Sequence, residues 1–152
     1  MSRIKHTVLI DDNKTTNFLN QYLMLKSKRF QRIDTYTNGN KVLQKFVDDP
    51  TFEPDIIFLD LDMPDINGWQ ILEAFEKQLA AKVKTKIFIL TSTINAEHHR
   101  RFIPKPFAPE YLIKPLDQKI IEALLQKYFP ETSSYIKKIN ENLNPNDSIN
   151  LI

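Results

Sequence analysis

The chain has 152 residues, of which 41% are hydrophobic and 11% aromatic, enough to fill one compact core and to exclude a disordered chain. The net charge of +2 is too small for a nucleic-acid-binding surface, and no apolar run reaches the roughly 18 residues that span a membrane. The absence of cysteine excludes a disulfide framework, a thiolate zinc site and a cysteine nucleophile. We therefore expect a cytoplasmic protein that neither binds nucleic acid directly nor inserts into a membrane.

Five short runs with the apolar character of strands alternate with longer segments of helical period. The strands are expected at residues 7–10, 32–36, 55–59, 86–90 and 111–113. Strands that alternate with helices are typical of a parallel sheet covered by helices on both faces. The predicted fold class is therefore α/β, with a doubly wound sheet of five parallel strands.

The segments between and after the strands carry apolar residues at helical spacing. In the first, Phe18, Tyr22 and Leu25 are spaced i, i+4 and i+7, with Leu19 and Leu23 beside them. Such a broad stripe is typical of a helix face that packs on a core. The later long helices are marked by Val42, Leu43 and Phe46, by Ile71, Leu72, Phe75 and Leu79, and by Ile120, Ile121, Leu124, Leu125 and Tyr128. A short polar helix is expected over residues 96–102, before a proline-rich stretch.

The composition changes after residue 130. Residues 131–152 contain five asparagines and are too few for a second domain. Within them Ile136, Ile139 and Leu143 are spaced i, i+3 and i+7, so we expect one or two helical turns that dock on the body. The predicted organisation is one domain over residues 1–130 and a partly helical or flexible C-terminal tail over residues 131–152.

Functional side chains follow four of the five predicted strands. Asp11 and Asp12 come after the first strand, Asp60 after the third, Thr91 after the fourth and Lys114 after the fifth. Right-handed crossovers bring the C-terminal ends of parallel strands to the same edge of a sheet, where ligands bind in open α/β folds. One pocket at that edge can therefore collect all five side chains.

The chemistry of these residues favours a metal ion and a phosphoryl group. Three carboxylates within a few ångström of one another stay ionised together only when a cation joins them, and oxygen ligands with room for water suit Mg²⁺. Beside the metal, Asp60 is the expected nucleophile toward a phosphoryl group. The ammonium group of Lys114 and the hydroxyl group of Thr91 are the expected partners of the phosphate oxygens.

Four blocks of the sequence together resemble a known family. They are the acidic pair Asp11-Asp12, the run Asp60-Leu-Asp-Met-Pro-Asp-Ile-Asn-Gly68, the strand end Leu90-Thr91-Ser92 and the dipeptide Lys114-Pro115. In order and spacing they are similar to the receiver domain of bacterial two-component response regulators, in particular to single-domain, chemotaxis-regulator-like proteins. The resemblance covers about residues 5–129. It implies a flavodoxin-like fold with strand order 2-1-3-4-5 for the domain over residues 1–130.

The resemblance also implies roles for the acidic residues. Asp60 would accept a phosphoryl group from a phosphohistidine on a sensor histidine kinase or a histidine phosphotransfer protein. Asp12, Asp60 and the main-chain carbonyl of Asp62 would bind Mg²⁺ directly, and Asp11 would act mainly through water. The chain would be a signalling phosphoacceptor, with self-catalysed phosphotransfer and dephosphorylation as its only reactions, and would act on a downstream protein partner.

Thr91 and Tyr111 are implied to be a switch pair. The Thr91 hydroxyl would turn toward the phosphoryl oxygens and the Tyr111 ring would move inward, which would alter the surface of the last two helices and the fifth strand.

The sequence departs from the family pattern in two places. Receiver domains usually have a pair of small residues before the fifth strand, whereas this chain has Phe107-Ala108-Pro109-Glu110, so an unusual connection from the fourth helix is expected. A second lysine-proline dipeptide is present, Lys105-Pro106. Lys114 is preferred as the site lysine because the strand-like run Tyr111-Leu-Ile113 directly precedes it.

Other functions are open at this point. The run from Ile57 to Asp62 is also similar to the first motif of haloacid-dehalogenase-type phosphatases, in which an aspartate nucleophile is followed two residues later by an aspartate acid-base. Against that hypothesis, Pro64 stands where that family has Thr or Val, and the motif would lie on the third strand instead of the first. Within the receiver resemblance, a phosphorelay carrier without its own output and a binding module that is never phosphorylated are the alternatives to a regulator.

Overall fold

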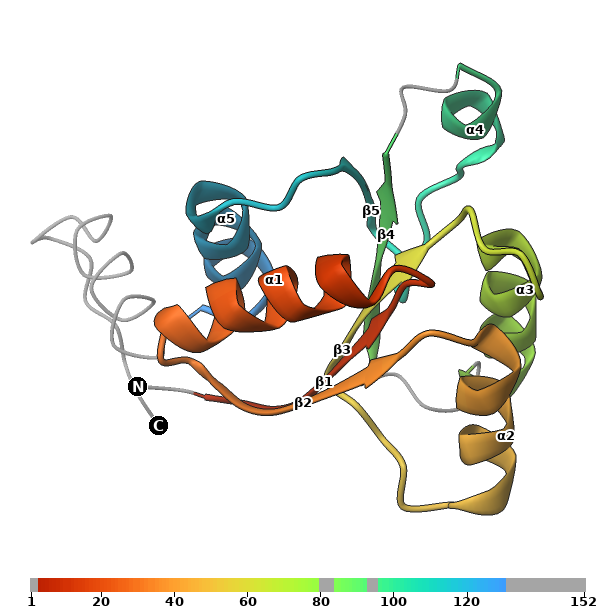
Figure 1. Ribbon diagram of the computed structural model, residues 1–152, viewed down its shortest axis with the longest axis horizontal. Helices are drawn as coiled ribbons and strands as arrows, with labels where there is room; N and C mark the ends of the chain where they lie inside the picture. The colour runs from red at the N-terminus through yellow and green to blue at the C-terminus, as the bar shows by residue number, and fades with distance from the viewer. Residues whose placement is uncertain (1–2, 80–83, 93–95, 131–152) are drawn as a thin grey trace, which may run out of the picture.

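The structure is a computed structural model and describes residues 3–79, 84–92 and 96–130. Its centre is one sheet of five parallel strands in the order β2-β1-β3-β4-β5 (Figure 1). The strands are β1 (Ile4–Ile10), β2 (Phe30–Tyr36), β3 (Ile56–Asp60), β4 (Lys86–Thr91) and β5 (Glu110–Ile113). The predicted fold class and the strand order implied by the family resemblance are both confirmed.

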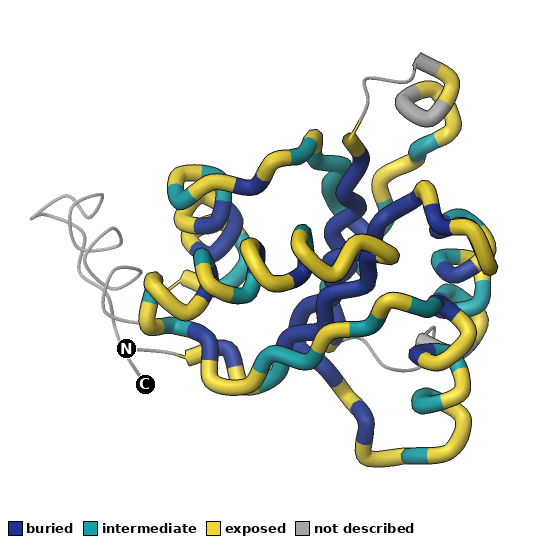
Figure 2. The backbone as a smooth tube through the Cα atoms, in the orientation of Figure 1, coloured by how far each residue is buried: buried dark blue, intermediate teal, exposed yellow. Residues whose placement is uncertain are grey.

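Helices cover both faces of the sheet (Figure 1). They are α1 (Lys14–Lys26), α2 (Gly39–Asp48), α3 (Gly68–Leu79), α4 (Ala96–Arg101) and α5 (Gln118–Tyr128). Helices α1 and α5 pack over one face, where Met24 and Leu124 join a cluster with strand residues such as Phe88. Helices α2 and α3 cover the other face, where Val42 and Phe75 are fully buried. Figure 2 shows the resulting buried centre, which is made mainly of strands.

Short polar side chains fix where three of the helices begin. The side-chain oxygen of Asn13 accepts a hydrogen bond from the main-chain N–H of Thr16, 3.0 Å away, and so caps α1. Asn38 caps α2 and Asp117 caps α5 in the same way. Because Asn13 directly follows the acidic pair Asp11-Asp12, the cap holds that pair in the short turn between β1 and α1.

Helix α1 buries a different face from the one that its apolar stripe predicts. The side chains directed into the protein are those of Asn17, Asn20 and Met24. The exposed fractions of the predicted stripe are 65% for Phe18, 57% for Tyr22 and 50% for Leu25, and that of Leu19 beside it is 56%. Leu23 is the one member of this set that packs partly against the core.

Hydrogen bonds explain this rotation of α1. The side-chain amide of Asn17 donates to the main-chain oxygens of Asp11, at 3.0 Å, and Tyr36, at 3.2 Å. The Asp11 carbonyl group is buried at the end of β1 and would cost free energy without a partner, whereas the Tyr36 oxygen, at the end of β2, also accepts from the main-chain N–H of Asp11. Satisfying them turns Asn17 inward, and the stripe consequently faces outward.

The segment between α4 and β5 is a tight turn. Lys105 and Ala108 form an antiparallel bridge with two main-chain hydrogen bonds of 3.1 and 3.0 Å, and the main-chain oxygen of Phe107 accepts from Ile87 of β4. Ala108 is almost fully buried in the cluster on the α2 and α3 side. Helix α4 has only six residues and lies apart from the other helices in Figure 1. The proline-rich turn therefore fills part of the core next to β4.

The predicted tail, residues 131–152, lies outside the described residues, so the division into a domain and a tail stays a prediction. Among the helices that the structure describes, none combines the length and the apolar character needed to cross a membrane.

Gly68 allows the first turn of α3 to approach the end of β3. A Cβ atom at Gly68 would lie 2.5 Å from the main-chain oxygen of Asp60 and 2.6 Å from the Cα atom of Leu61. At Gly39, the first residue of α2, the nearest atoms would instead be side-chain carbons, Ile71 Cδ1 at 2.4 Å and Ile66 Cγ2 at 2.5 Å. Backbone atoms can shift less than side-chain atoms, so the two glycines differ in what a methyl group would displace.

We expect Gly68→Ala to lower the free energy of unfolding by about 1–3 kcal/mol, and to cost more than Gly39→Ala. Both glycines open a helix, so the gain in helix propensity is similar and the difference reports the clash. Urea denaturation of the two variants and the wild type measures it. An equal loss in both variants would contradict this explanation.

Candidate functional site

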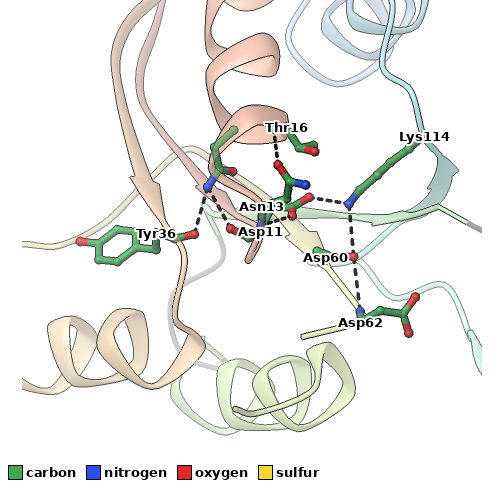
Figure 3. Close-up of polar contacts among 8 residues, drawn as sticks. Asp11, Asn13, Thr16, Tyr36, Asp60, Asp62 and Lys114 are labelled. Atoms are coloured by element: carbon green, nitrogen blue, oxygen red, sulfur yellow. Dashed lines mark hydrogen bonds and ion pairs between the residues drawn. The ribbon is translucent and has the colours of Figure 1, made fainter. Parts of the chain in front are cut away.

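Polar residues end or follow four of the strands at the C-terminal edge of the sheet, and Figure 3 shows three of them, Asp11, Asp60 and Lys114. Asp11 follows β1, Asp60 is the last residue of β3, Thr91 is the last residue of β4, and Lys114 follows β5. The parallel strand order β1-β3-β4-β5 places these ends side by side. The structure thus brings Asp11, Asp60 and Lys114, which are far apart in the sequence, into direct contact.

Lys114 links the two buried carboxylates. Its Nζ atom forms an ion pair with Asp11 Oδ2 and lies 3.4 Å from Asp60 Oδ1. Its main-chain N–H donates to the main-chain oxygen of Thr91 at 2.7 Å, which fixes the residue at the sheet edge. The alternative lysine, Lys105, forms an ion pair with Glu76 of α3 instead. The structure therefore places Lys114, and not Lys105, at this site.

The acidic cluster has the composition of a magnesium site. Asp11, Asp12 and Asp60 each offer a carboxylate oxygen, and these oxygens lie within 4.8 Å of one another. The Asp11 and Asp60 residues are 4% exposed, whereas Asp12 is exposed, so one side of the cluster is open to solvent. Mg²⁺ prefers carboxylate oxygens in sites where it can keep several waters. The three acidic residues fit such a site.

The raised pKa of Asp60 also favours a cation at this cluster. Burial of its carboxyl group raises the pKa of Asp60 to about 6; the charge of Lys114 opposes this rise and the charge of Asp11 adds to it. The N–H of Asp62, 3.3 Å from Asp60 Oδ1, also favours the ionised form. One ammonium group is thus too little positive charge for two buried carboxylates. A divalent cation at the cluster would supply the remainder.

Lys114 stays charged in this environment. Burial by itself would lower the pKa of Lys114, but its hydrogen bond to Asp11 and the charges of Asp60 and Asp11 outweigh that effect, and the pKa is raised. The site therefore keeps a fixed positive charge beside Asp60 at neutral pH.

Hydrogen bonds hold Asp11 in place, and one of its partners was missed by the sequence analysis. Asp11 Oδ1 accepts from the main-chain N–H of Asn13 at 2.9 Å, and the main-chain N–H of Asp11 donates to Tyr36 at 3.0 Å. The missed partner is Asn17, a buried residue whose side-chain amide donates to the main-chain oxygen of Asp11. The sequence held no local signal for Asn17, because the apolar stripe of α1 predicted a different face of the helix as the buried one.

The remaining predicted site residues lie around this centre. Thr91 is fully buried and pairs across the ladder with Ile113, whereas Asp62 is exposed. Tyr111 is half-buried, and its ring lies 5.7 Å from the ring of Phe102 at an interplanar angle of 38°. Thr91 ends β4 and Tyr111 lies within β5. The switch role of Thr91 and Tyr111 and the carbonyl ligand at Asp62 stay predictions.

A cavity of about 350 Å³ adjoins the site on the α1 side. Its walls come from α1 and from the turn between β5 and α5, and they include Leu19, Tyr22, Lys114 and Pro115. The hydrocarbon part of the site lysine thus forms one wall of a mainly apolar hollow beside the carboxylates.

Comparisons with known proteins agree with this geometry. The family model of the response regulator receiver domain matches residues 7–126. A two-component response regulator from Cytophaga hutchinsonii is 27% identical and has a TM-score of 0.76 over 85% of this chain and 99% of that one. Response regulator protein TrrA from Thermotoga maritima, in complex with Mg²⁺ and BeF, is 27% identical and has a TM-score of 0.63 over 82% and 98% of the two chains.

Curated relatives are longer than this chain. The protein-glutamate methylesterase/protein-glutamine glutaminase of Clostridium acetobutylicum is 28% identical over an alignment of 148 positions, which covers 92% of this chain and 41% of that protein. The chain spans about half the length of the curated relatives that it matches. The similarity therefore concerns one region of those proteins.

We expect Asp12→Ala to weaken Mg²⁺ binding at least about tenfold, because the substitution removes the exposed carboxylate of the cluster while leaving the buried ion pairs intact. Calorimetric titration of the protein with Mg²⁺ measures the loss. Asp65→Ala, which removes an exposed carboxylate outside the cluster, is the matched control. Unchanged affinity in Asp12→Ala would exclude Asp12 as a ligand.

Proposed function

The chain belongs to the response regulator receiver domain family, and on that basis we propose that Asp60 accepts a phosphoryl group from a phosphohistidine donor in a Mg²⁺-dependent reaction. The observation that carries the proposal is the contact of buried Asp60 with Lys114 inside a cluster of three carboxylates. As a receiver domain the chain is a signalling phosphoacceptor and not a classical enzyme. The family match contradicts the haloacid-dehalogenase-type alternative, and the aspartate motif lies on β3, as a receiver requires.

In the proposed reaction an oxygen of Asp60 attacks phosphorus, the bond from phosphorus to the donor imidazole breaks, and that imidazole leaves with the electron pair. Asp12, Asp60 and the Asp62 carbonyl are the proposed ligands of the metal, with Asp11 acting through water. Bound Mg²⁺ supplies positive charge for the carboxylates and the phosphoryl oxygens. The complex of TrrA with Mg²⁺ and BeF supports this assignment by analogy.

Lys114 and Thr91 are the proposed partners of the new phosphoryl group. Lys114 Nζ already lies beside Asp60 Oδ1, so it can move onto a phosphoryl oxygen with a small displacement. Thr91 ends the neighbouring strand β4, next to β3 in the sheet. A shift of the Thr91 hydroxyl would free space that the Tyr111 ring fills, and this packing change is the proposed switch.

We propose that phosphorylation of Asp60 changes the surface formed by α4, β5 and α5. Receiver domains are phosphorylated by histidine kinases, and the donor here is either such a kinase or a histidine phosphotransfer protein. We propose that the chain regulates a protein partner directly, and the alternative is a relay carrier that passes the phosphoryl group on. The methylesterase and glutaminase activities named for the Clostridium relative form no part of this proposal, because this chain covers 41% of that protein. The cytoplasmic location stays a prediction.

A small phosphodonor such as acetyl phosphate, with Mg²⁺, is expected to add one phosphoryl group to the wild type and none to Asp60→Asn. Intact-mass spectrometry measures the labelling. Asp62→Asn removes a carboxylate two residues away and should still be labelled. Equal labelling of the wild type and Asp60→Asn would refute Asp60 as the acceptor.

Lys114→Ala is expected to accept the phosphoryl group but to lose most of the conformational response, because the phosphoryl oxygens lack their cationic partner. The single tryptophan, Trp69, lies under Arg101 of α4, with 4.7 Å between the guanidinium carbon and the ring centroid, so its fluorescence reports on the α3–α4 contact. Lys119→Ala on the exposed side of α5 is the control. A full fluorescence change in labelled Lys114→Ala would count against this role.

A further inference from the structure

Hydrogen bonds hold the main chain on both sides of Asp12, the exposed member of the acidic cluster. The peptide group before Asp12 carries the main-chain oxygen of Asp11, which accepts from Asn17 Nδ2 at 3.0 Å. The peptide group after Asp12 carries the main-chain N–H of Asn13, which donates to Asp11 Oδ1 at 2.9 Å. Because peptide groups are planar, these two bonds together restrict the backbone dihedral angles of Asp12 and the direction in which its side chain leaves the chain.

The side chain of Asn17 is itself firmly placed. The residue is 4% exposed, and its main-chain N–H donates to the main-chain oxygen of Asn13 at 3.1 Å, within the first turn of α1. An amide nitrogen carries two hydrogens, and Asn17 Nδ2 also donates to the main-chain oxygen of Tyr36 at 3.2 Å. That oxygen accepts from the main-chain N–H of Asp11 as well, at 3.0 Å. Asn17 therefore ties the acidic turn to the end of β2.

The three carboxylates of the cluster differ in what holds them. Asp11 forms an ion pair with Lys114, and Asp60 Oδ1 lies 3.4 Å from Lys114 Nζ. Asp12 is exposed, so packing does not fix its side chain, and the position of its carboxylate depends on the main chain that carries it. Mg²⁺ requires a nearly ideal octahedral arrangement of ligands at short distances. The main-chain direction at Asp12 is therefore expected to affect how well this carboxylate serves as a ligand.

We infer that Asn17 is a positioning residue for the metal, because its side-chain amide holds the main chain before Asp12 in the direction that brings the Asp12 carboxylate to Mg²⁺. The inference rests on the proposed role of Asp12 as a metal ligand. Asn17 does not bind the metal itself and acts through the main chain of the acidic turn. Loss of its amide is expected to weaken Mg²⁺ binding about tenfold, as is usual for groups that orient metal ligands.

Asn17→Leu tests the inference, because leucine is similar in size to asparagine but has no N–H group to donate. Asn20→Leu is the matched control, since Asn20 is also a buried asparagine of α1, 8% exposed, and lies about one turn further from the acidic residues. Calorimetric titration with Mg²⁺ is expected to show about tenfold weaker binding in Asn17→Leu and unchanged binding in Asn20→Leu. Unchanged binding in Asn17→Leu, or an equal loss in both variants, would overturn the inference.

A double-mutant cycle separates positioning of Asp12 from a general loosening of the fold. If Asn17 acts through Asp12, adding Asn17→Leu to the Asp12→Ala chain should cause little further loss of Mg²⁺ affinity. A further tenfold loss in that chain would mean that Asn17 acts on the rest of the cluster, and would contradict the inference. Urea denaturation of the same variants without Mg²⁺ verifies that each is folded during the titration. If Asn17→Leu does not fold, Asn17→Ala and Asn20→Ala provide the same comparison.

The titrations also distinguish this inference from the proposed function, because they need no phosphodonor. Weaker binding in Asp12→Ala together with unchanged binding in Asn17→Leu would leave the metal site in place and refute only the role of Asn17. Unchanged binding in both variants would refute the ligand role of Asp12 and the inference with it.

Discussion

The ion pair of Lys114 with Asp11 and its contact with Asp60 are the interactions on which the site depends. Two carboxylates are almost fully buried at the edge of the sheet, and one ammonium group lies close to both. Burial of the Asp60 carboxyl group raises its pKa to about 6, the charge of Lys114 opposes this rise, and the charge of Asp11 adds to it. A site with a permanent deficit of positive charge is prepared to receive a divalent cation. Lys114 keeps the carboxylates together at the edge where the cation would bind.

The position of Asp11 constrains α1 as well. Asn17 bonds to the main-chain oxygens at the ends of β1 and β2, which fixes both the turn that carries the acidic pair and the rotation of the helix after it. The same bonds turn the apolar stripe of α1 outward. The hydrogen bonds of one buried amide therefore act on the acidic cluster and on the exposed face of α1 together.

The region proposed to respond to phosphorylation lies next to the stretch in which the sequence departs from the family pattern. The turn at residues 105–108 packs Ala108 into the core, and its lysine, Lys105, is held by Glu76 of α3. Arg101 of α4 lies over the ring of Trp69, also in α3. Arg101 and Lys105 thus both join the region around α4 to α3. A change at the site must alter these two contacts in order to move α4.

The sequence by itself determined the five strands, the alternation with helices and the set of polar residues at the strand ends, because the period of apolar residues and the breaks in it are local properties. It also selected Lys114 over Lys105, since only the former follows a strand-like run. The tertiary structure alone decided which face α1 buries. The buried face depends on a hydrogen bond between Asn17 of α1 and Tyr36 of β2. The pattern of apolar residues within α1 does not predict this bond, because its partner lies in another element. For the same reason the imbalance of charge around Asp60 appears only when distant strands bring their ends together.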